Sequence, residues 1–362
     1  MKFLDLFAGI GGFRLGMESA GHECVGFCEI DKYARASYKA IHNTEGEIEL
    51  HDITAVSDES IRGFGSVDVI CGGFPCQAFS IAGHRRGFED TRGTLFFEIC
   101  RFASILRPKY LFLENVRGLL NHDGGATFET IIRTLDGLGY DVEWQVLNSK
   151  NFGVPQNRER VFIIGHLRGE RTRNVFPIGR ESEQSDRQQS KIEIVGNTKN
   201  PNGTSQGTGS VVYDSNGLIG TIQPNFNQSG VVYETDGISP TIRAYQGGGL
   251  EPKIRVKEAT SQGYAEAEIG DSVNLSHPNS KTRRGRVGKQ IANTLLTGES
   301  QGVVEPDFRI RKLTPRECWR LQGFPDWAFD KAQEVNSNSQ LYKQAGNSVT
   351  VNVITAIAKE LK

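Results

Sequence analysis

The sequence lacks any long hydrophobic run. No stretch approaches the roughly 18 to 20 consecutive apolar residues of a membrane-spanning helix. The first residues, MKFLDLFAGIGG, do not show the basic region, apolar core and cleavage site of a secretory signal. We therefore expect a cytoplasmic protein without a membrane segment.

Cysteine is scarce and lacks the spacing of a metal site. Cys24 and Cys28 form one loose pair, and no second pair exists among the six cysteines, which stand at 24, 28, 71, 76, 100 and 318. Zinc sites normally show two such pairs. We expect reduced thiols and no bound metal.

An excess of charge of either sign is also absent. The 42 Lys+Arg and 43 Asp+Glu residues give a formal net charge of -1, which excludes a global basic field that attracts nucleic acid. Local patches can still bind DNA, and three segments are basic: 84–92, 156–160 and 281–286. For each segment the alternative is a solvated surface.

A large α/β domain is what the first 166 residues predict. At 37% hydrophobic content the chain can form a real core. Apolar runs typical of strands alternate with amphipathic segments typical of helices, which indicates a mostly parallel, doubly wound sheet. The predicted strands are 2–7, 23–30, 67–74, 110–116, 140–148 and 160–167, and the predicted helices are 11–21, 31–43, 94–108 and 127–139.

From about residue 168 the composition changes to Gly, Ser, Asn, Gln and Thr. This composition continues until about residue 308 and predicts a second, smaller, irregular β-rich domain. Two later segments, 313–324 and 344–361, are predicted to be helical and to pack back on the first domain. The expected division of the chain is 1–167, 168–308 and 309–362.

An imperfect repeat lies inside the second region, where residues 210–223 match residues 230–243. Each copy contains an Asn-Gly or Asp-Gly dipeptide, which is typical of a hairpin turn. We predict paired hairpins, and a plain structural duplication is the alternative.

The first two predicted strands end in residues suited to a nucleotide cofactor. The glycine-rich turn DLFAGIGG (5–12) lets a ligand approach the backbone and opens a helix with free N–H groups. Glu29 ends the second strand, where a doubly wound fold places the acid that binds ribose hydroxyls. Because the spacing is not GxGxxG, S-adenosylmethionine is favoured over a nicotinamide cofactor.

Two further strand ends carry reactive side chains. GGFPCQAFS (72–80) places Cys76 in a turn, and LFLENV (111–116) places Glu114 and Asn115 at the same carboxyl edge of the sheet. A buried structural cysteine and a helix-capping carboxyl are the alternatives. Because Cys76 and Glu114 are both expected to face the cofactor crevice, the roles of nucleophile and acid are favoured for them.

A family resemblance is carried by six segments in fixed order: DLFAGIGG, GGFPCQAFS, ENV, QNRERVFIIG, LTPRECWRLQGFP and QAGNSVTVNV. Over nearly the whole chain this order resembles the prokaryotic cytosine-5 DNA methyltransferases of restriction–modification systems. The resemblance implies a Rossmann-like, S-adenosylmethionine-dependent methyltransferase domain with a target-recognition domain in the variable region. It also implies that a cytosine is flipped out of double-stranded DNA and methylated at carbon 5.

The resemblance assigns roles to individual residues. Cys76 is the implied nucleophile at cytosine carbon 6, and Glu114 the implied proton donor at N3. Arg160, with Arg158 nearby, would steady negative charge on the base. The implied cofactor-binding residues are Phe7, Gly9, Gly11, Glu29, Ile30, Asp52, Ile53, Pro75, Leu95 and Asn347.

DNA contacts are expected in two places. The loop 80–92 is predicted to be a mobile lid with phosphate contacts from Ser80, Arg85, Arg86 and Arg92. In the variable region, Gln228, Thr241 and Tyr245 are expected near the bases. A monomer is expected, and the existence of a cognate restriction endonuclease, which would act separately, is left open.

Three other functions remain open. A transfer-RNA cytosine-5 methyltransferase has the same fold, although its close relatives have a shorter variable segment. In a nicotinamide-dependent oxidoreductase Cys76 would be incidental. The third alternative is a catalytically inactive DNA-binding regulator, which the intact Pro75-Cys76-Gln77 disfavours.

Overall fold

The chain divides into two compact units in the computed structural model. The first comprises Met1–Arg180, Thr294–Gly298 and Thr314–Lys362, and the second comprises Glu181–Asn293 and Glu299–Leu313. The residues described are 1–75, 95–178, 254–277, 280–282, 284–298, 300–306 and 309–362, together with the backbone of 218–221 and 231–233.

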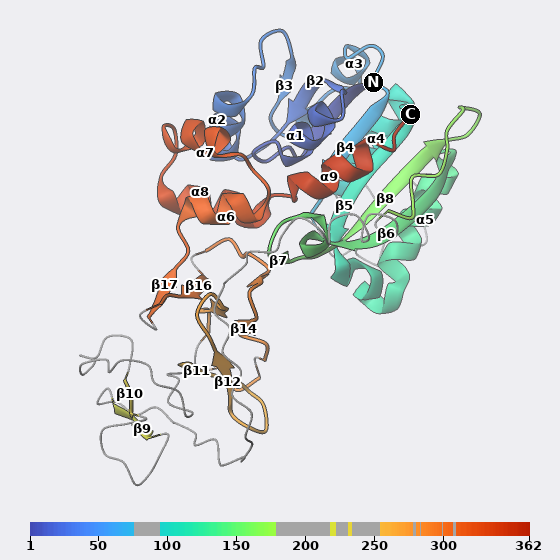
Figure 1. Cartoon of the computed structure of the whole chain (residues 1–362). Coiled ribbons are helices and arrows are strands. Elements are labelled where there is room, and N and C mark those ends of the chain that lie inside the picture. The colour runs from blue at the N-terminus through green and yellow to red at the C-terminus, as the bar shows by residue number, and fades with distance from the viewer. Residues whose placement is uncertain are drawn as a thin grey trace. The chain divides into compact units, whose positions relative to one another are not determined.

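Seven strands form the main sheet of the first unit, in the order β3-β2-β1-β4-β5-β8-β6 (Figure 1). The order reverses at β1, where a doubly wound sheet opens a crevice at the carboxyl ends of its strands. Strand β8 is antiparallel to both of its neighbours, whereas the pairs among β1 to β5 are parallel. The predicted fold class is therefore confirmed. The strands are β1 (Lys2–Leu6), β2 (Glu23–Cys28), β3 (Ile48–Leu50), β4 (Val69–Gly73), β5 (Tyr110–Val116), β6 (Tyr140–Asn148) and β8 (Glu159–Leu167).

Alternation along the strands builds a hydrophobic core on each face of this sheet. On β1, Leu4 and Leu6 belong to one core together with Phe96 of α4, whereas Phe3 belongs to the other with Ile354 of α9. Side chains on a strand point to opposite faces in turn, so both faces need a cover of helices. The helices are α1 (Gly12–Ser19), α2 (Lys32–Ile41), α3 (Asp58–Arg62), α4 (Leu95–Leu106), α5 (Ala126–Gly137), α6 (Pro315–Leu321), α7 (Asp326–Gln333), α8 (Asn338–Asn347) and α9 (Val351–Ala358).

Short 3-10 helices complete the first unit at Ile53–Ala55, Arg117–Gly125 and Ser149–Phe152, and the two-residue strand β7 is Gln156–Asn157. Among the described residues, no helix has the length and apolar character needed to cross a bilayer.

The sequence predicted one helix over the C-terminal segment 344–361, but the structure has two helices there. Helix α8 ends at Asn347, and Ser348 and Thr350 adopt extended backbone angles before α9 begins. The Thr350 hydroxyl donates to Gln322 Oε1 at 2.9 Å, so the break is held by a buried partner distant in sequence. Helix α9 then packs on α1, where a Cβ at Gly16 would lie 2.5 Å from Ile354 Cγ2.

The described part of the second unit is made of short antiparallel strands. Its four-stranded sheet has the order β14-β13-β16-β17, and β11 pairs with β12. A small core joins Ile254, Val256, Ala267, Val273 and Val304. The strands are β9 (Leu218–Thr221), β10 (Val231–Tyr233), β11 (Ile254–Lys257), β12 (Tyr264–Ala267), β13 (Ser272–Asn274), β14 (Val287–Gly288), β15 (Ala292–Asn293), β16 (Gln301–Val304) and β17 (Ile310–Lys312).

The sequence repeat contributes one strand from each copy. Strand β9 from the first copy pairs antiparallel with β10 from the second. The described pairing therefore joins the two copies, whereas the sequence predicted a hairpin within each. The Asn-Gly and Asp-Gly turns of those hairpins lie outside the described residues.

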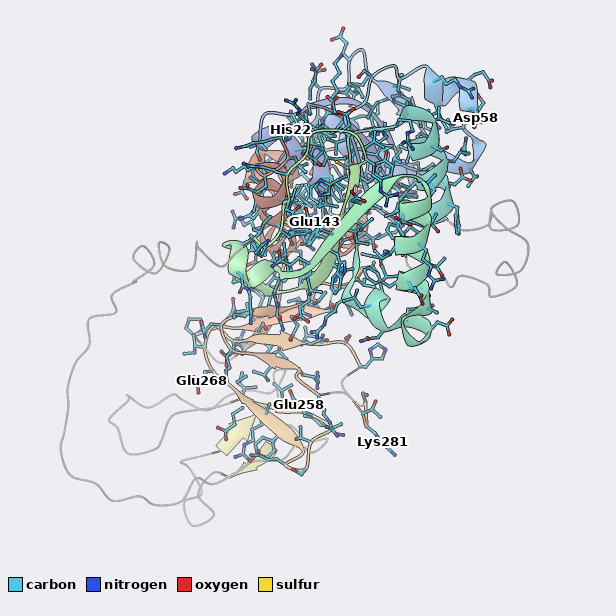
Figure 2. The ribbon with its side chains drawn as sticks, turned by 90° about the vertical axis from the view of Figure 1, so that its right-hand side faces the viewer. His22, Asp58, Glu143, Glu258, Glu268 and Lys281 are labelled. Atoms are coloured by element: carbon cyan, nitrogen blue, oxygen red, sulfur yellow. The ribbon has the colours of Figure 1, made fainter. Side chains whose placement is uncertain are left out.

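The basic segment 281–286 is partly structural. Arg286 is buried, and its Nε and Nη1 donate to the carbonyl oxygens of Asn274 at 3.0 Å and Lys257 at 2.8 Å. The carboxylate of Glu258, labelled in Figure 2, accepts the N–H of Gly285 at 3.2 Å. Arg286 therefore stabilises the second unit and is not part of a solvated patch.

Candidate active site at the carboxyl edge of the sheet

A cleft of about 430 Å³ opens in the first unit where strands β1, β2, β4 and β5 end. The carboxyl edge of a doubly wound sheet is where cofactors bind. The cleft brings together eight predicted residues: Phe7, Gly9, Glu29, Pro75, Glu114, Arg158, Arg160 and Asn347.

The glycine-rich turn after β1 presents its backbone to this cleft. Phe7 and Gly9 have φ angles of 55° and 57°, in the left-handed region that favours glycine. A Cβ built on Gly9 would meet no atom within 4 Å. The space beside Gly9 is thus free for a ligand that approaches the main chain.

Glu29 is held rigidly at the end of β2. Its Oε2 accepts the N–H of Gly9 at 2.8 Å and its Oε1 accepts the N–H of Asp31 at 2.7 Å. A carboxylate oxygen has a second lone pair, so each oxygen can still accept a ligand hydroxyl. This arrangement fits the ribose of a nucleoside cofactor.

An ion pair between Lys343 and Asp31 joins α8 to the start of α2 beside the cleft. The Nζ of Lys343 lies 2.6 Å from Asp31 Oδ2, while Asp31 Oδ1 accepts the N–H of Tyr33 at 2.8 Å. Partial burial acts to raise the pKa of Asp31, but the hydrogen bonds from Lys343 and Tyr33 outweigh it, and the pKa is lowered. Sequence analysis missed both residues, although Lys343 directly precedes QAGNSVTVNV.

Five predicted cofactor residues do not line this cleft. Gly11 has a φ of 83° and faces His42, whose Nε2 would lie 2.0 Å from a Cβ. Ile30 is 69% exposed beside Glu29. The other three are Asp52, Ile53 and Leu95.

Asp52, Ile53 and Leu95 have structural contacts. The Asp52 carboxylate accepts the N–H of Thr54 at 2.9 Å, which caps a 3-10 helix. Hydrogen bonds from Thr54 lower the pKa of Asp52. Ile53 is buried in the core that contains α4, and Leu95 packs against that core. Their contacts with a cofactor stay predictions.

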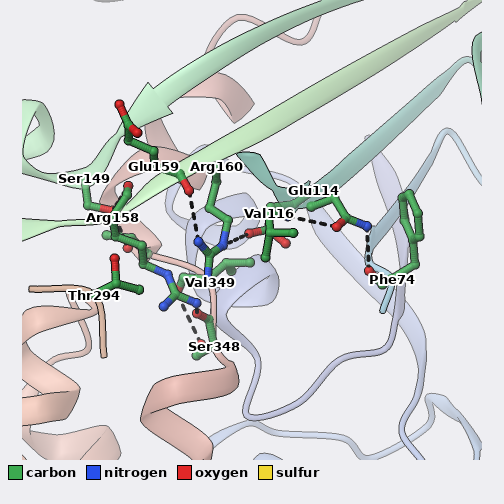
Figure 3. A network of polar contacts seen from close by, with 12 residues as sticks. Phe74, Glu114, Val116, Ser149, Arg158, Glu159, Arg160, Thr294, Ser348 and Val349 are labelled. Carbon is green, nitrogen blue, oxygen red and sulfur yellow. Dashed lines mark hydrogen bonds and ion pairs between the residues drawn. The ribbon is translucent and has the colours of Figure 1, made fainter. Parts of the chain in front are cut away.

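Glu114 and Arg160 form a pair on neighbouring strands. Antiparallel pairing sets Arg160 of β8 opposite Val116 of β5, and Arg160 Nε lies 2.8 Å from Glu114 Oε1 (Figure 3). Burial raises the pKa of Glu114, although the positive charges of Arg160 and Arg158 act to lower it. The site therefore favours a protonated carboxyl more than water does.

Asn115 fixes the end of β4 against the end of β5. Its Nδ2 donates to the carbonyl of Phe74 at 2.8 Å, and its Oδ1 accepts the N–H of Val116 at 2.8 Å (Figure 3). The described chain reaches Pro75 in the cleft wall. Cys76 is the next residue and lies outside the described residues, as do the predicted DNA contacts Ser80, Arg85, Arg86, Arg92, Gln228, Thr241 and Tyr245.

Arg158 has a different environment from Arg160. It is 2% exposed, and its Nη2 donates to the carbonyls of Gly346 at 3.1 Å and Ser348 at 2.8 Å (Figure 3). Burial lowers the pKa of the guanidinium, and the charge of Arg160 adds to this effect. Arg158 thus holds main chain in place, whereas Arg160 pairs with the carboxyl.

The fold and the cleft together define a class. A doubly wound sheet with an acid after β2 that contacts the glycine-rich turn, and with a buried carboxyl–arginine pair beside β5, is typical of a Rossmann-like enzyme with a nucleoside cofactor. The family model described as C-5 cytosine-specific DNA methylase matches residues 1–362. The chain belongs to this family, and it is an S-adenosylmethionine-dependent DNA cytosine-5 methyltransferase.

Similar proteins match almost end to end. The orphan methyltransferase M.SPRI of Bacillus phage SPR is 35% identical, over 100% of this chain and 97% of its own. The type II methyltransferase M.HhaI of Haemophilus parahaemolyticus is 35% identical over 99% and 93% of the two chains. For M.HpaII of Haemophilus parainfluenzae the identity is 36%, over 99% and 88%.

Solved structures share the fold. A protein encoded within an E. coli prophage matches with a TM-score of 0.55 at 22% identity, over 99% of this chain and 98% of that one. DNMT2 of Spodoptera frugiperda matches with a TM-score of 0.54 at 18% identity, over the same shares. The predicted family, fold and cofactor are confirmed, and the oxidoreductase alternative is excluded.

Proposed function

We propose that Cys76, Glu114 and Arg160 divide the chemistry of methylation between them. The observation that carries this proposal is the 2.8 Å contact between Arg160 and a buried Glu114, in a cleft whose wall ends at Pro75. Cytosine carbon 5 is a weak nucleophile, and the three side chains together make it a stronger one.

The thiolate of Cys76 adds to carbon 6 of the flipped cytosine. A sulfur–carbon bond forms, the 5,6 double bond opens, and the ring becomes an enamine with its electron density directed to carbon 5. S-adenosylmethionine would supply the electrophilic methyl group that carbon 5 takes up, and the broken sulfur–methyl bond would leave S-adenosylhomocysteine. A base then removes the carbon 5 proton, and the sulfur–carbon bond breaks to restore the double bond and release the thiolate.

Glu114 and Arg160 act on the opposite edge of the base. N3 and O2 of cytosine are both bonded to carbon 2 and lie on the same edge of the ring. A carboxyl and a guanidinium that are already paired can therefore each contact one of these two atoms. Glu114 donates its proton to N3 as negative charge develops, and its raised pKa favours the protonated form that this step needs. Arg160 steadies the charge at O2.

The turn of Phe7 and Gly9 would hold the cofactor, and Glu29 would bind its ribose hydroxyls. Pro75 and Asn347 contribute to the same wall. Ile30, exposed directly after Glu29, would cover the adenine ring. The support for this placement is the empty space at Gly9 and the free lone pairs of Glu29.

The second unit selects the target sequence. Its sequence contains the Tyr- and Thr-bearing repeat, and it contributes none of the residues that the chemistry requires. Gln228, Thr241 and Tyr245 are the proposed base contacts, while Ser80, Arg85, Arg86 and Arg92 are proposed to bind phosphates.

The proposed cellular role is DNA modification in the bacterial cytoplasm by a monomer, beside a separate restriction endonuclease. Full-length type II relatives favour this role. A second candidate is an orphan enzyme without an endonuclease, which the match to 97% of M.SPRI favours.

Bisulfite sequencing of DNA from cells that express the protein tests the proposal. We expect methylated cytosine in one defined sequence context, and none in cells that express Cys76→Ser. Unmodified DNA together with methylated transfer RNA would contradict the proposed DNA substrate.

A further inference from the structure

The strap, residues 294–298, comes from the variable part of the sequence but folds with the catalytic unit. The chain leaves the second unit after Asn293 and returns to it at Glu299. The sequence placed residues 294–298 in the predicted second domain, 168–308, whereas the structure groups them with the first unit. Its contacts suggest a task other than reading DNA.

Three polar contacts fix the strap to β7 and to Arg158, which directly precedes β8. The Thr294 hydroxyl donates to the carbonyl of Asn157 at 2.7 Å, and the N–H of Leu295 donates to Gln156 Oε1 at 3.1 Å. The carbonyl of Leu295 accepts from Arg158 Nη1 at 3.5 Å, and Figure 3 shows Thr294 beside Arg158. Gln156 is completely buried, so its amide has no access to water in place of the strap.

Gly346 lies directly against the main chain of the strap. A Cβ on this residue would lie 2.3 Å from Leu296 O, 2.5 Å from Leu296 C and 2.8 Å from Thr297 N. These are backbone atoms, which cannot rotate out of the way as the end of a side chain can. Gly346 stands in the last turn of α8, where alanine is otherwise the better helix former. The close approach of the strap therefore requires glycine there.

The other side of the same turn faces the cofactor cleft. Gly346, Asn347 and Ser348 all line it. Arg158 donates to the carbonyls of Gly346 and Ser348 while it also contacts the strap, so one buried guanidinium holds both segments. The strap is thus the support behind the cofactor-side turn.

We propose that the strap positions residues 346–348 for S-adenosylmethionine. It touches neither the cofactor nor the reacting atoms, and it acts through Gly346 and Arg158. The proposal rests on the proposed function only in taking this cleft as the cofactor cleft. It separates residues 294–298 from the sequence-reading role of the residues around them.

A matched pair of glycine substitutions tests the proposal. Gly346→Ala forces the turn and the strap apart, so the dissociation constant for S-adenosylmethionine, titrated calorimetrically without DNA, should rise roughly tenfold. Gly298→Ala lies in the strap itself, but its Cβ would meet nothing within 4 Å, and it should bind the cofactor as the wild type does. The KM for DNA should change in neither variant, because the turn is displaced on the cofactor side.

A second pair keeps the test decisive if thermal unfolding shows that Gly346→Ala does not fold. Thr294→Val removes the hydroxyl that donates to Asn157 and should weaken cofactor binding about threefold. Thr297→Val removes an exposed hydroxyl that makes no hydrogen bond among the described residues, and it should change nothing. Wild-type cofactor affinity in both Gly346→Ala and Thr294→Val, or equal losses in the controls, would overturn the proposal.

The experiments distinguish a failure of the proposed function from a failure of this inference. Cofactor titration needs no DNA, so an absence of methylated cytosine in cells would leave the effect of the strap measurable. A rise in the KM for DNA with unchanged cofactor affinity in Gly346→Ala would instead assign the strap to DNA binding and overturn the inference alone.

Discussion

Arg160 Nε lies 2.8 Å from Glu114 Oε1, and the two residues come from adjacent antiparallel strands of the sheet. Two opposing influences therefore act on one carboxyl: burial favours its neutral form and the guanidinium favours its charged form. Burial is the larger, and the pKa of Glu114 is raised. This balance suits a carboxyl that must keep its proton until N3 of the cytosine accepts it.

Glu114→Gln should lower the single-turnover rate of methylation by about 100-fold or more, because the amide cannot deliver a proton as charge develops. DNA affinity should change little, since the amide keeps the shape and can still donate a hydrogen bond. An unchanged single-turnover rate would remove Glu114 from the mechanism.

The pH dependence of the wild-type rate follows from the same carboxyl. In the proposed mechanism Glu114 reacts in its protonated form, and its pKa is raised, so the single-turnover rate should fall as pH rises through that raised pKa. Glu114→Gln should lose this limb of the profile. A wild-type limb that survives in the variant belongs to another group.

Arg158 and Arg160 should behave differently when each is changed to methionine. Arg158→Met leaves two or more main-chain carbonyls without a buried donor and should lower the free energy of unfolding by about 1–3 kcal/mol. Arg160→Met should instead reduce the methylation rate with a smaller effect on stability, because we propose that Arg160 contacts the reacting edge of the base. Urea unfolding and single-turnover kinetics on both variants measure the contrast, and identical phenotypes would contradict it.

Much of this site could be predicted because its residues stand at the ends of short, strongly patterned strands. Glu29 and Glu114 each follow an apolar run, and the parallel sheet brings such ends together. Strand β3 was missed, since the three residues Ile48–Leu50 are too few to show alternation. The burial of Arg158 was also missed, because its acceptors, Gly346 and Ser348, are almost 190 residues away in the chain.

The break between α8 and α9 shows the limit of helical periodicity. Apolar residues continue at helical spacing through 344–361, but the backbone is held extended by two buried hydrogen bonds, one from Arg158 to the carbonyl of Ser348 and one from the Thr350 hydroxyl to Gln322. Tertiary contacts therefore override the local preference of this turn for helix. The same turn lines the cofactor cleft, so a structural exception coincides with a proposed binding site.

A buried carboxyl outside the cleft makes stability depend on pH. Asp5 is completely buried on β1, and its Oδ1 has no hydrogen-bond partner among the described residues, while Oδ2 accepts from Tyr38 at 3.4 Å. Burial raises the pKa of Asp5 well above its ordinary value, although Arg14 acts to lower it. The native state therefore keeps a proton that the unfolded state releases above pH about 4.

Asp5→Asn should gain stability relative to the wild type as pH rises from about 4 to the raised pKa of Asp5. The wild type should lose about 1.4 kcal/mol of unfolding free energy for each unit between the two pKa values, and the neutral amide should not. Urea unfolding across this pH window measures the difference. Parallel stability curves for the two proteins would contradict the prediction.

Sequence specificity should be transferable with the second unit. A relative with a different target should acquire the target of this chain when its corresponding segments are replaced by residues 181–293 and 299–313. Bisulfite sequencing of host DNA measures the methylated sequence. Gln228→Ala and Thr241→Ala should relax or change the target, whereas Arg85→Ala and Arg86→Ala should weaken methylation evenly at all sites, because phosphate contacts carry no sequence information. An active chimaera that keeps the recipient's target would refute the assignment.

The central claim is that Cys76 attacks cytosine carbon 6, and a duplex with 5-fluorocytosine at the target position tests it most directly. Fluorine at carbon 5 blocks the final proton removal, so in the presence of S-adenosylmethionine the wild-type enzyme should remain covalently bound to DNA. Peptide mass spectrometry should place the modification on Cys76. Cys76→Ser should form no adduct while it still binds cofactor and duplex. A trapped adduct in Cys76→Ser, or a wild-type adduct on any other residue, would contradict the mechanism.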